Sequence, residues 1–106
     1  MSSILEGKDA DITKGRFDFV LRLLMENFDV SQKEVADLSG VSLSFVNDLF
    51  HGRKQQLSIK RAEQISMAFP DDRINGTALF ILSDRSENPL IVEIRKNLIR
   101  KLRLKE

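Results

Sequence analysis

Residues 30–50 have the sequence VSQKEVADLSGVSLSFVNDLF, which predicts two short helices joined by a glycine turn. Ser31 and Glu34 form the S-x-x-E pattern, in which each side chain covers a backbone N–H that the first helical turn leaves unpaired. Gly40 stands where the chain must leave the first helix, because glycine adopts the left-handed conformation without a steric penalty. The capping box and Gly40 therefore set the expected start and end of the first helix.

The two predicted helices cover residues 32–39 and 43–50, and Ser42 is a candidate cap for the second. The apolar side chains expected on their inner sides are Val35, Ala36, Leu38, Val41, Val46 and Leu49, with Phe45 and Phe50 nearby. Ala36 is small, which suits two helices that cross closely. Such a pair holds the second helix away from the body of the protein, so that its outer face can enter a DNA major groove.

The pattern over residues 30–69 resembles the lambda repressor-like helix-turn-helix family, which includes many phage, plasmid and antitoxin repressors. The matching positions are Ser31, Gln32, Ala36, Gly40, Val41, Ser42, Val46, Leu49, Phe50 and Gly52, followed by the helical pattern of residues 57–69. Ser39 departs from the family pattern, which usually has a larger apolar residue there. The resemblance implies an all-α fold, a helix-turn-helix domain of four to five helices with an additional C-terminal helix.

The resemblance also implies a DNA-binding surface on the second helix and the loop after it. Its candidate residues are Gln32, Ser42, Leu43, Ser44, Asn47, Asp48, His51, Arg53, Lys54 and Gln55. Gln32 matches a residue that lies against a phosphate, where helix N-terminal amides also favour an anion. Asn47 suits an adenine edge, Leu43 a thymine methyl and Asp48 a cytosine amino group. The loop residues from His51 to Gln55 are expected at the sugar-phosphate backbone.

Two alternatives concern this surface. The predicted base-reading face has no arginine or lysine of its own, and Asp48 lowers affinity for DNA unless a base donor meets it. A protein-interaction module, such as an antitoxin or antirepressor, is therefore the second interpretation. Phe45 is expected to be buried or half-buried in the core and not to be a wedge between bases.

Composition excludes several other classes of protein. The 106 residues carry a net charge of +1 with no cysteine, so neither a disulfide scaffold nor a thiolate metal site is expected. No apolar run approaches the ~20 residues of a membrane span, and the first residues do not resemble a signal peptide. One histidine and no phosphate-cradling glycine motif argue against an enzyme, a cofactor or a small-molecule substrate. A cytoplasmic protein is expected.

The charge is distributed unevenly along the chain. Residues 1–50 carry five Lys and Arg against nine Asp and Glu, whereas residues 51–106 carry twelve against seven. Attraction to phosphate should therefore come from the loop after the second motif helix and from the later helices. The alternative is that this basic half is simply solvated.

Three segments are expected: a flexible N-terminus (1–12), a helix-turn-helix domain (13–72) and a C-terminal helical extension (73–106). A first helix should run from a cap at Thr13 to about Asn27. Ser58 should cap a fourth helix with Ile59, Ala62, Ile65 and Phe69 inward. The predicted core consists of Leu21, Leu24, Val35, Ala36, Val41, Val46, Leu49, Ile59, Ala62 and Ile65. The apolar run over residues 77–82 fits a buried helix or a strand, and a short helix is preferred.

Asn88 and Pro89 predict the start of the last helix. Its apolar side carries Leu90, Ile91, Ile94, Leu98 and Leu102, and its other sides carry Arg95, Lys96, Arg100 and Lys101. A dimer contact through Ile91, Ile94, Leu98 and Leu102 is the preferred explanation of the apolar side. Packing back on the same chain is the alternative, and contact with a membrane surface is the third.

These features predict a sequence-specific regulator of transcription that binds double-stranded DNA as a homodimer. The resemblance favours a repressor of phage or plasmid type, acting on a palindromic operator.

Overall fold

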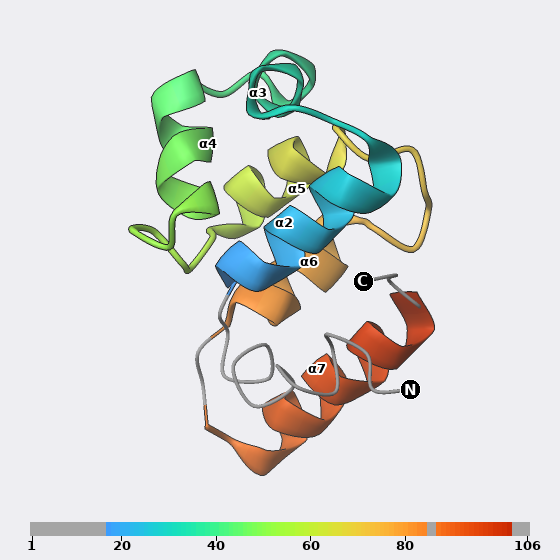
Figure 1. Ribbon diagram of the computed structural model, residues 1–106. Coiled ribbons are helices and arrows are strands. Elements are labelled where there is room, and N and C mark those ends of the chain that lie inside the picture. The colour runs from blue at the N-terminus through green and yellow to red at the C-terminus, as the bar shows by residue number, and fades with distance from the viewer. Residues whose placement is uncertain (1–16, 85–86, 103–106) are drawn as a thin grey trace.

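The computed structural model describes residues 17–84 and 87–102, and these ranges are helical with no β-strand. The helices are α2 (Phe17–Phe28), α3 (Gln32–Ser39), α4 (Leu43–Phe50), α5 (Ile59–Ser66), α6 (Gly76–Ser83) and α7 (Pro89–Leu102). α3 and α4 lie at one end of the molecule and α7 lies at the other (Figure 1). The predicted all-α fold is therefore confirmed. The expected cap at Thr13 and the segment 1–12 lie outside the described residues.

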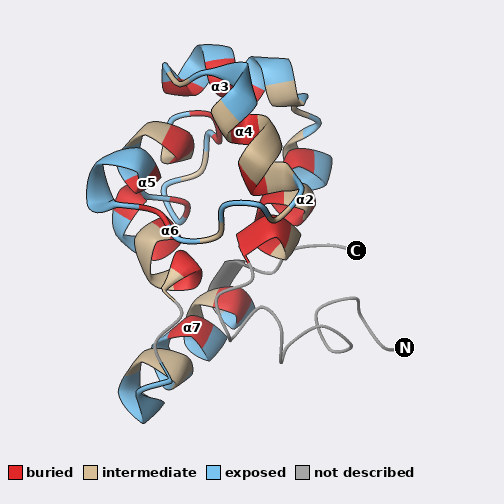
Figure 2. Cartoon of the chain, turned by 90° about the vertical axis from the view of Figure 1, so that its left-hand side faces the viewer, coloured by how far each residue is buried: buried red, intermediate tan, exposed pale blue. Residues whose placement is uncertain are grey.

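α2 is the helix around which the core forms, and it packs against α4 and α6. Phe17, Leu21 and Leu24 are fully buried, as Figure 2 shows for most of this helix. The other predicted core residues that are buried are Val35, Ala36, Val46, Leu49, Ala62 and Ile65. Burying each large aliphatic side chain contributes about 1.5–3 kcal/mol before conformational entropy is subtracted.

Two predictions of inward-facing residues are wrong, since Leu38, expected on the inner side of its helix, and Ile59, expected in the core, are both exposed. α3 buries Val35, Ala36 and Ser39, and the arc that these three span leaves Leu38 outside because each residue turns the helix by about 100°. Ile59 begins α5. Because each residue turns the helix by about 100°, Ile59 lies on a different side of α5 from the buried Ile65. Val41, also predicted in the core, is half-buried and packs against the edge of the core.

The apolar run at residues 77–82 forms α6, which confirms the preference for a helix over a strand. Asn75 caps it, because the backbone N–H of Ala78 donates to Asn75 Oδ1 at 2.9 Å. Gly76 lies where α5 and α6 approach most closely: a Cβ there would come 2.5 Å from Glu63 Cγ and 3.0 Å from Glu63 Cα. The close crossing buries α6 against the domain.

α7 begins as predicted, with the backbone N–H of Leu90 donating to Asn88 Oδ1 at 2.9 Å. Arg95, expected on the polar side, is instead buried against α6, and its Nη1 donates to the backbone carbonyl of Asp84. Burial lowers the pKa of Arg95, and the nearby charge of Asp84 opposes this shift. Arg95 and Ile99, one turn apart on α7, are buried, whereas Leu90 and Ile94 of the predicted apolar side are exposed.

The loop between α5 and α6 contains a tight ion pair between Asp71 and Arg73. Arg73 Nη2 donates to Asp71 Oδ2 at 2.6 Å, and the Arg73 backbone N–H donates to Asp71 Oδ1 at 2.9 Å. The side-chain hydrogen bond from Arg73, followed by the backbone one, lowers the pKa of Asp71 from 3.8 to about 2. The carboxylate therefore closes the turn that follows Pro70.

We expect Asp71 to titrate near pH 2 in a carboxyl-detected NMR experiment, and Arg73→Gln to return the midpoint toward 3.8. A folded-state pKa below the unfolded value means that the contribution to stability is present above pH 3.8. This contribution is lost as the pH falls toward 2. A midpoint near 3.8 in the wild-type protein would contradict the ion pair.

Candidate nucleic-acid interface

α3 and α4 begin and end at the residues that the sequence predicted. The Glu34 N–H donates to Ser31 Oγ at 3.1 Å, and the Ser31 N–H donates to Glu34 Oε1 at 3.2 Å. Gly40 takes the left-handed conformation with φ of 69°, and its N–H donates to the Ala36 carbonyl. Ser42 Oγ caps α4 by accepting from the Phe45 N–H at 3.1 Å. These local bonds fix the angle at which α4 leaves the turn.

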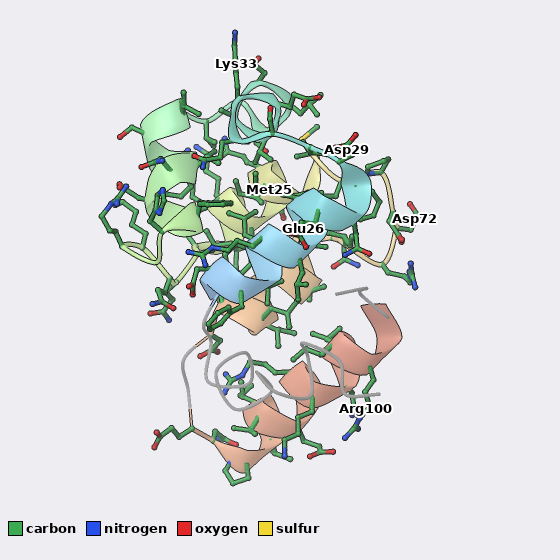
Figure 3. All side chains as sticks on the ribbon, in the orientation of Figure 1. Met25, Glu26, Asp29, Lys33, Asp72 and Arg100 are labelled. Carbon is green, nitrogen blue, oxygen red and sulfur yellow. The ribbon has the colours of Figure 1, made fainter. Side chains whose placement is uncertain are left out.

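An open hollow of about 650 Å³ lies between the N-terminal ends of α3 and α4. Its lining residues are Ser31, Gln32, Lys33, Leu43, Ser44 and Asn47. Leu43 is 50% exposed on the outer face of α4. Lys33, which the sequence analysis did not single out, extends from α3 into solvent at this end of the molecule (Figure 3). The hollow thus combines an apolar side chain, helix N-terminal amides and a nearby cation.

A polar network crosses the outer face of α4 and connects α3 with the loop after α4. Asn47 Nδ2 donates to Gln32 Oε1 at 3.1 Å. Arg53 Nη2 donates to Asn47 Oδ1, and Arg53 Nε donates to Asp48 Oδ1 at 2.8 Å. α4 itself has no basic residue, but Arg53 of the following loop places a positive charge on its outer face. The same contact pairs the charge of Asp48.

Two of the predicted loop residues are turned toward the protein. The His51 ring lies edge-on to Phe50 with centroids 5.1 Å apart, although the residue is exposed. Gln55 is half-buried, and its Nε2 donates to the Gly52 carbonyl at 3.2 Å. Gly52 has φ of 76°, which shapes this loop. Gln55 thus closes the loop on itself.

Phe45 is half-buried against the core, as expected, and two cations lie over its ring. Lys54 Nζ is 5.9 Å from the ring centroid and Arg61 Cζ is 5.1 Å from it. We call Lys54 and Arg61 the basic flank. Arg61 belongs to the first turn of α5 and was missed by the sequence analysis, which predicted only that the later helices supply positive charge. Cation–aromatic contacts of this kind stabilise the position of a long side chain.

Arg22 anchors the other end of α4. Its Nε donates to the Phe50 carbonyl at 2.9 Å, and its guanidinium lies 5.0 Å from the centre of the Phe50 ring. A cation is favourable at a helix C-terminus, where the carbonyls carry partial negative charge. The bond spans 28 positions along the chain, so no local pattern could have indicated it.

The described residues show no sign of a metal centre or a membrane span. No group of three or more His, Cys, Asp or Glu in this part of the chain could hold a metal ion. None of the helices in residues 17–84 and 87–102 combines the length and apolar character needed to cross a bilayer.

Two short helices crossing at a glycine turn, the second with an exposed polar outer face, define a helix-turn-helix DNA-binding domain. A family model described as Helix-turn-helix matches residues 21–70. Residues 21–70 are thus similar to the helix-turn-helix family, and the resemblance to lambda repressor-like proteins is confirmed over this region. Comparison with curated proteins and with solved structures gives no match. The match supports a DNA-binding regulator of transcription, and members of the matched family are generally not enzymes.

Proposed function

We propose that the protein is a repressor that binds a palindromic operator as a homodimer, with α4 in the major groove. The main support is that the outer face of α4 is open: Ser42, Leu43 and Ser44 are exposed there. α7 lies at the opposite end of the molecule and does not cover this face (Figure 1). An α-helix with its side chains is about 10–12 Å wide, which matches a major groove of about 12 Å.

Several of the predicted contacts have a defined physical role in this proposal. The N-terminus of α3, with Gln32 and the nearby Lys33, would meet a phosphate, and the basic flank would meet the backbone on the other side of α4. Leu43 and Asn47 would face base edges. Occupation of a promoter by such a complex represses transcription by excluding the polymerase.

The dimer part of the proposal is supported by the outer side of α7. Leu90 is 74% exposed and Ile94 is 41% exposed, one turn apart on the same side of the helix. Ile91 and Leu98 are half-buried beside them, and the side chain of Leu102 lies outside the described residues. Two copies joined by a two-fold axis would place their α4 helices in successive major grooves, about 34 Å apart.

The experiment is a measurement of binding to genomic DNA fragments at about 50 and 200 mM salt. A protein that neutralises phosphates loses affinity steeply as salt rises, because condensed counterions are released on binding. Little binding at either salt concentration would contradict the proposal and would favour the protein-interaction module.

We expect Lys54→Ala to weaken binding to every DNA sequence by a similar factor. The variant removes one phosphate contact, so the slope of log affinity against log salt should fall by about 1. Lys96→Ala is the matched control, because it removes the same charge from an exposed position on α7. Equal salt slopes for wild type and Lys54→Ala would exclude this side chain from the phosphate contacts.

A further inference from the structure

We propose that Arg53 reads a guanine base in the operator, and that Asp48 and Asn47 hold it in position for this contact. This inference rests on the DNA-binding function proposed above. It assigns Arg53 a role in specificity in place of the phosphate contact expected from the sequence.

The first step is that Arg53 is fixed to α4 at both its backbone and its side chain. Its backbone N–H donates to the Asp48 carbonyl at 2.9 Å. Its Nε donates to Asp48 Oδ1 at 2.8 Å and its Nη2 donates to Asn47 Oδ1. Asn47 is itself fixed by its bond to Gln32 on α3. The guanidinium therefore lies over the outer face of α4, which faces the groove in the proposed complex.

The second step concerns the donors that remain. An arginine has five N–H donors in a rigid planar fork, and the hydrogen bonds to Asp48 and Asn47 occupy Nε and one hydrogen of Nη2. Three N–H donors therefore remain, two on Nη1 and one on Nη2, and the Arg53 side chain is 56% exposed. Guanine presents O6 and N7 as adjacent acceptors in the major groove, a pattern that no other base offers. A pair of parallel N–H donors matches that pattern.

The third step separates a base from a phosphate as the partner. A carboxylate 2.8 Å from Arg53 Nε reduces the attraction of this side chain for a phosphate, and it also repels the phosphate directly. An exposed ion pair of this kind contributes little to stability, but it restricts the guanidinium to one orientation. A fixed orientation favours a two-point contact, whereas a lysine binds a phosphate as a point charge and needs no such orientation. Lys54, in the same loop, has no such acidic partner among the described contacts and suits the phosphate role.

The test is selection of bound oligonucleotides from a random pool with the full chain, followed by affinity measurements on all four bases at each selected position. Wild type should prefer guanine at one position of each half-site by about tenfold or more, the discrimination typical of a two-point arginine contact. Arg53→Ala should remove this preference and leave the other positions unchanged. Arg53→Lys keeps the charge without the planar fork, so it should also lose the guanine preference.

Asp48→Asn and Lys54→Ala complete the comparison. Asp48→Asn loosens the guanidinium, so we expect weaker guanine preference with no loss of affinity for random DNA. Lys54→Ala should keep the preference while affinity falls for all sequences. An Arg53→Ala variant that keeps every base preference, and loses affinity uniformly with a smaller salt slope, would show a phosphate contact and overturn the inference alone. A wild-type protein with no salt-dependent DNA binding would overturn the proposed function as well.

Discussion

Replacement of Leu49 by alanine is expected to lower the free energy of unfolding by about 2–5 kcal/mol, the range for truncation of a buried leucine. Leu49 is fully buried in α4 and belongs to the core cluster, so the truncated side chain leaves a cavity that its packed neighbours fill only partly. In a domain of this size each kcal/mol lowers the melting temperature by about 4–8 °C. Thermal and urea unfolding followed by circular dichroism measure the loss.

Leu43→Ala is the matched control, because it makes the same chemical change six positions earlier in the same helix. Leu43 is 50% exposed, and we expect its truncation to change the free energy of unfolding by no more than about 0.5 kcal/mol. In the proposed complex Leu43 faces the bases, so this variant should change base preference while it remains folded. Equal destabilisation by the two substitutions would mean that α4 is packed differently from the structure.

Helix boundaries in the motif were predictable because the signals that set them are local. Ser31 and Glu34 are three residues apart and bond to each other's backbone, and Gly40 and Ser42 act on their immediate neighbours. Each signal has one favourable geometry. The predicted ranges 32–39 and 43–50 are therefore those of α3 and α4.

Packing partners were less predictable, because they depend on which face each helix presents to distant segments. Leu38 is more apolar than Ser39, yet Ser39 is the residue that α3 buries. The sequence showed only that Ser39 stands where the family pattern usually has a larger apolar residue, and it did not indicate that Ser39 is buried. Arg95 shows the same limit: composition places an arginine in solvent, whereas the carbonyl at the C-terminal end of α6 supplies a partner for a buried guanidinium.

The candidate site follows the same division. The sequence predicted which residues belong to α4 and to the loop, and the resemblance assigned them a common surface. The direction of the Arg53 side chain was not predictable, because it depends on bonds to Asp48 and Asn47 across a loop that turns back on the helix. The contact of Arg61 with Phe45 was missed for the same reason.

The second large effect is expected from Ile94→Glu on α7. In the proposed dimer this side chain is covered by the partner, so burial of an unpaired carboxylate opposes association. We expect the sedimentation mass to fall from dimer to monomer. The affinity for a two-half-site operator should fall by about 100-fold or more, because the second half-site is then no longer bound at high effective concentration. Affinity for a single half-site should be unchanged.

Ile94 is a better probe than Leu98, which is half-buried against the core of its own chain, so that a charge there would also destabilise the monomer. Lys96→Glu is the control: it adds negative charge to α7 at an exposed position, about 200° around the helix from Ile94. This variant should remain dimeric. An unchanged dimer in Ile94→Glu would exclude the exposed side of α7 as the interface. A wild-type protein that is monomeric at all concentrations would contradict dimerisation. It would also count against a palindromic operator, because the two half-sites of such an operator correspond to the two-fold axis of a dimer.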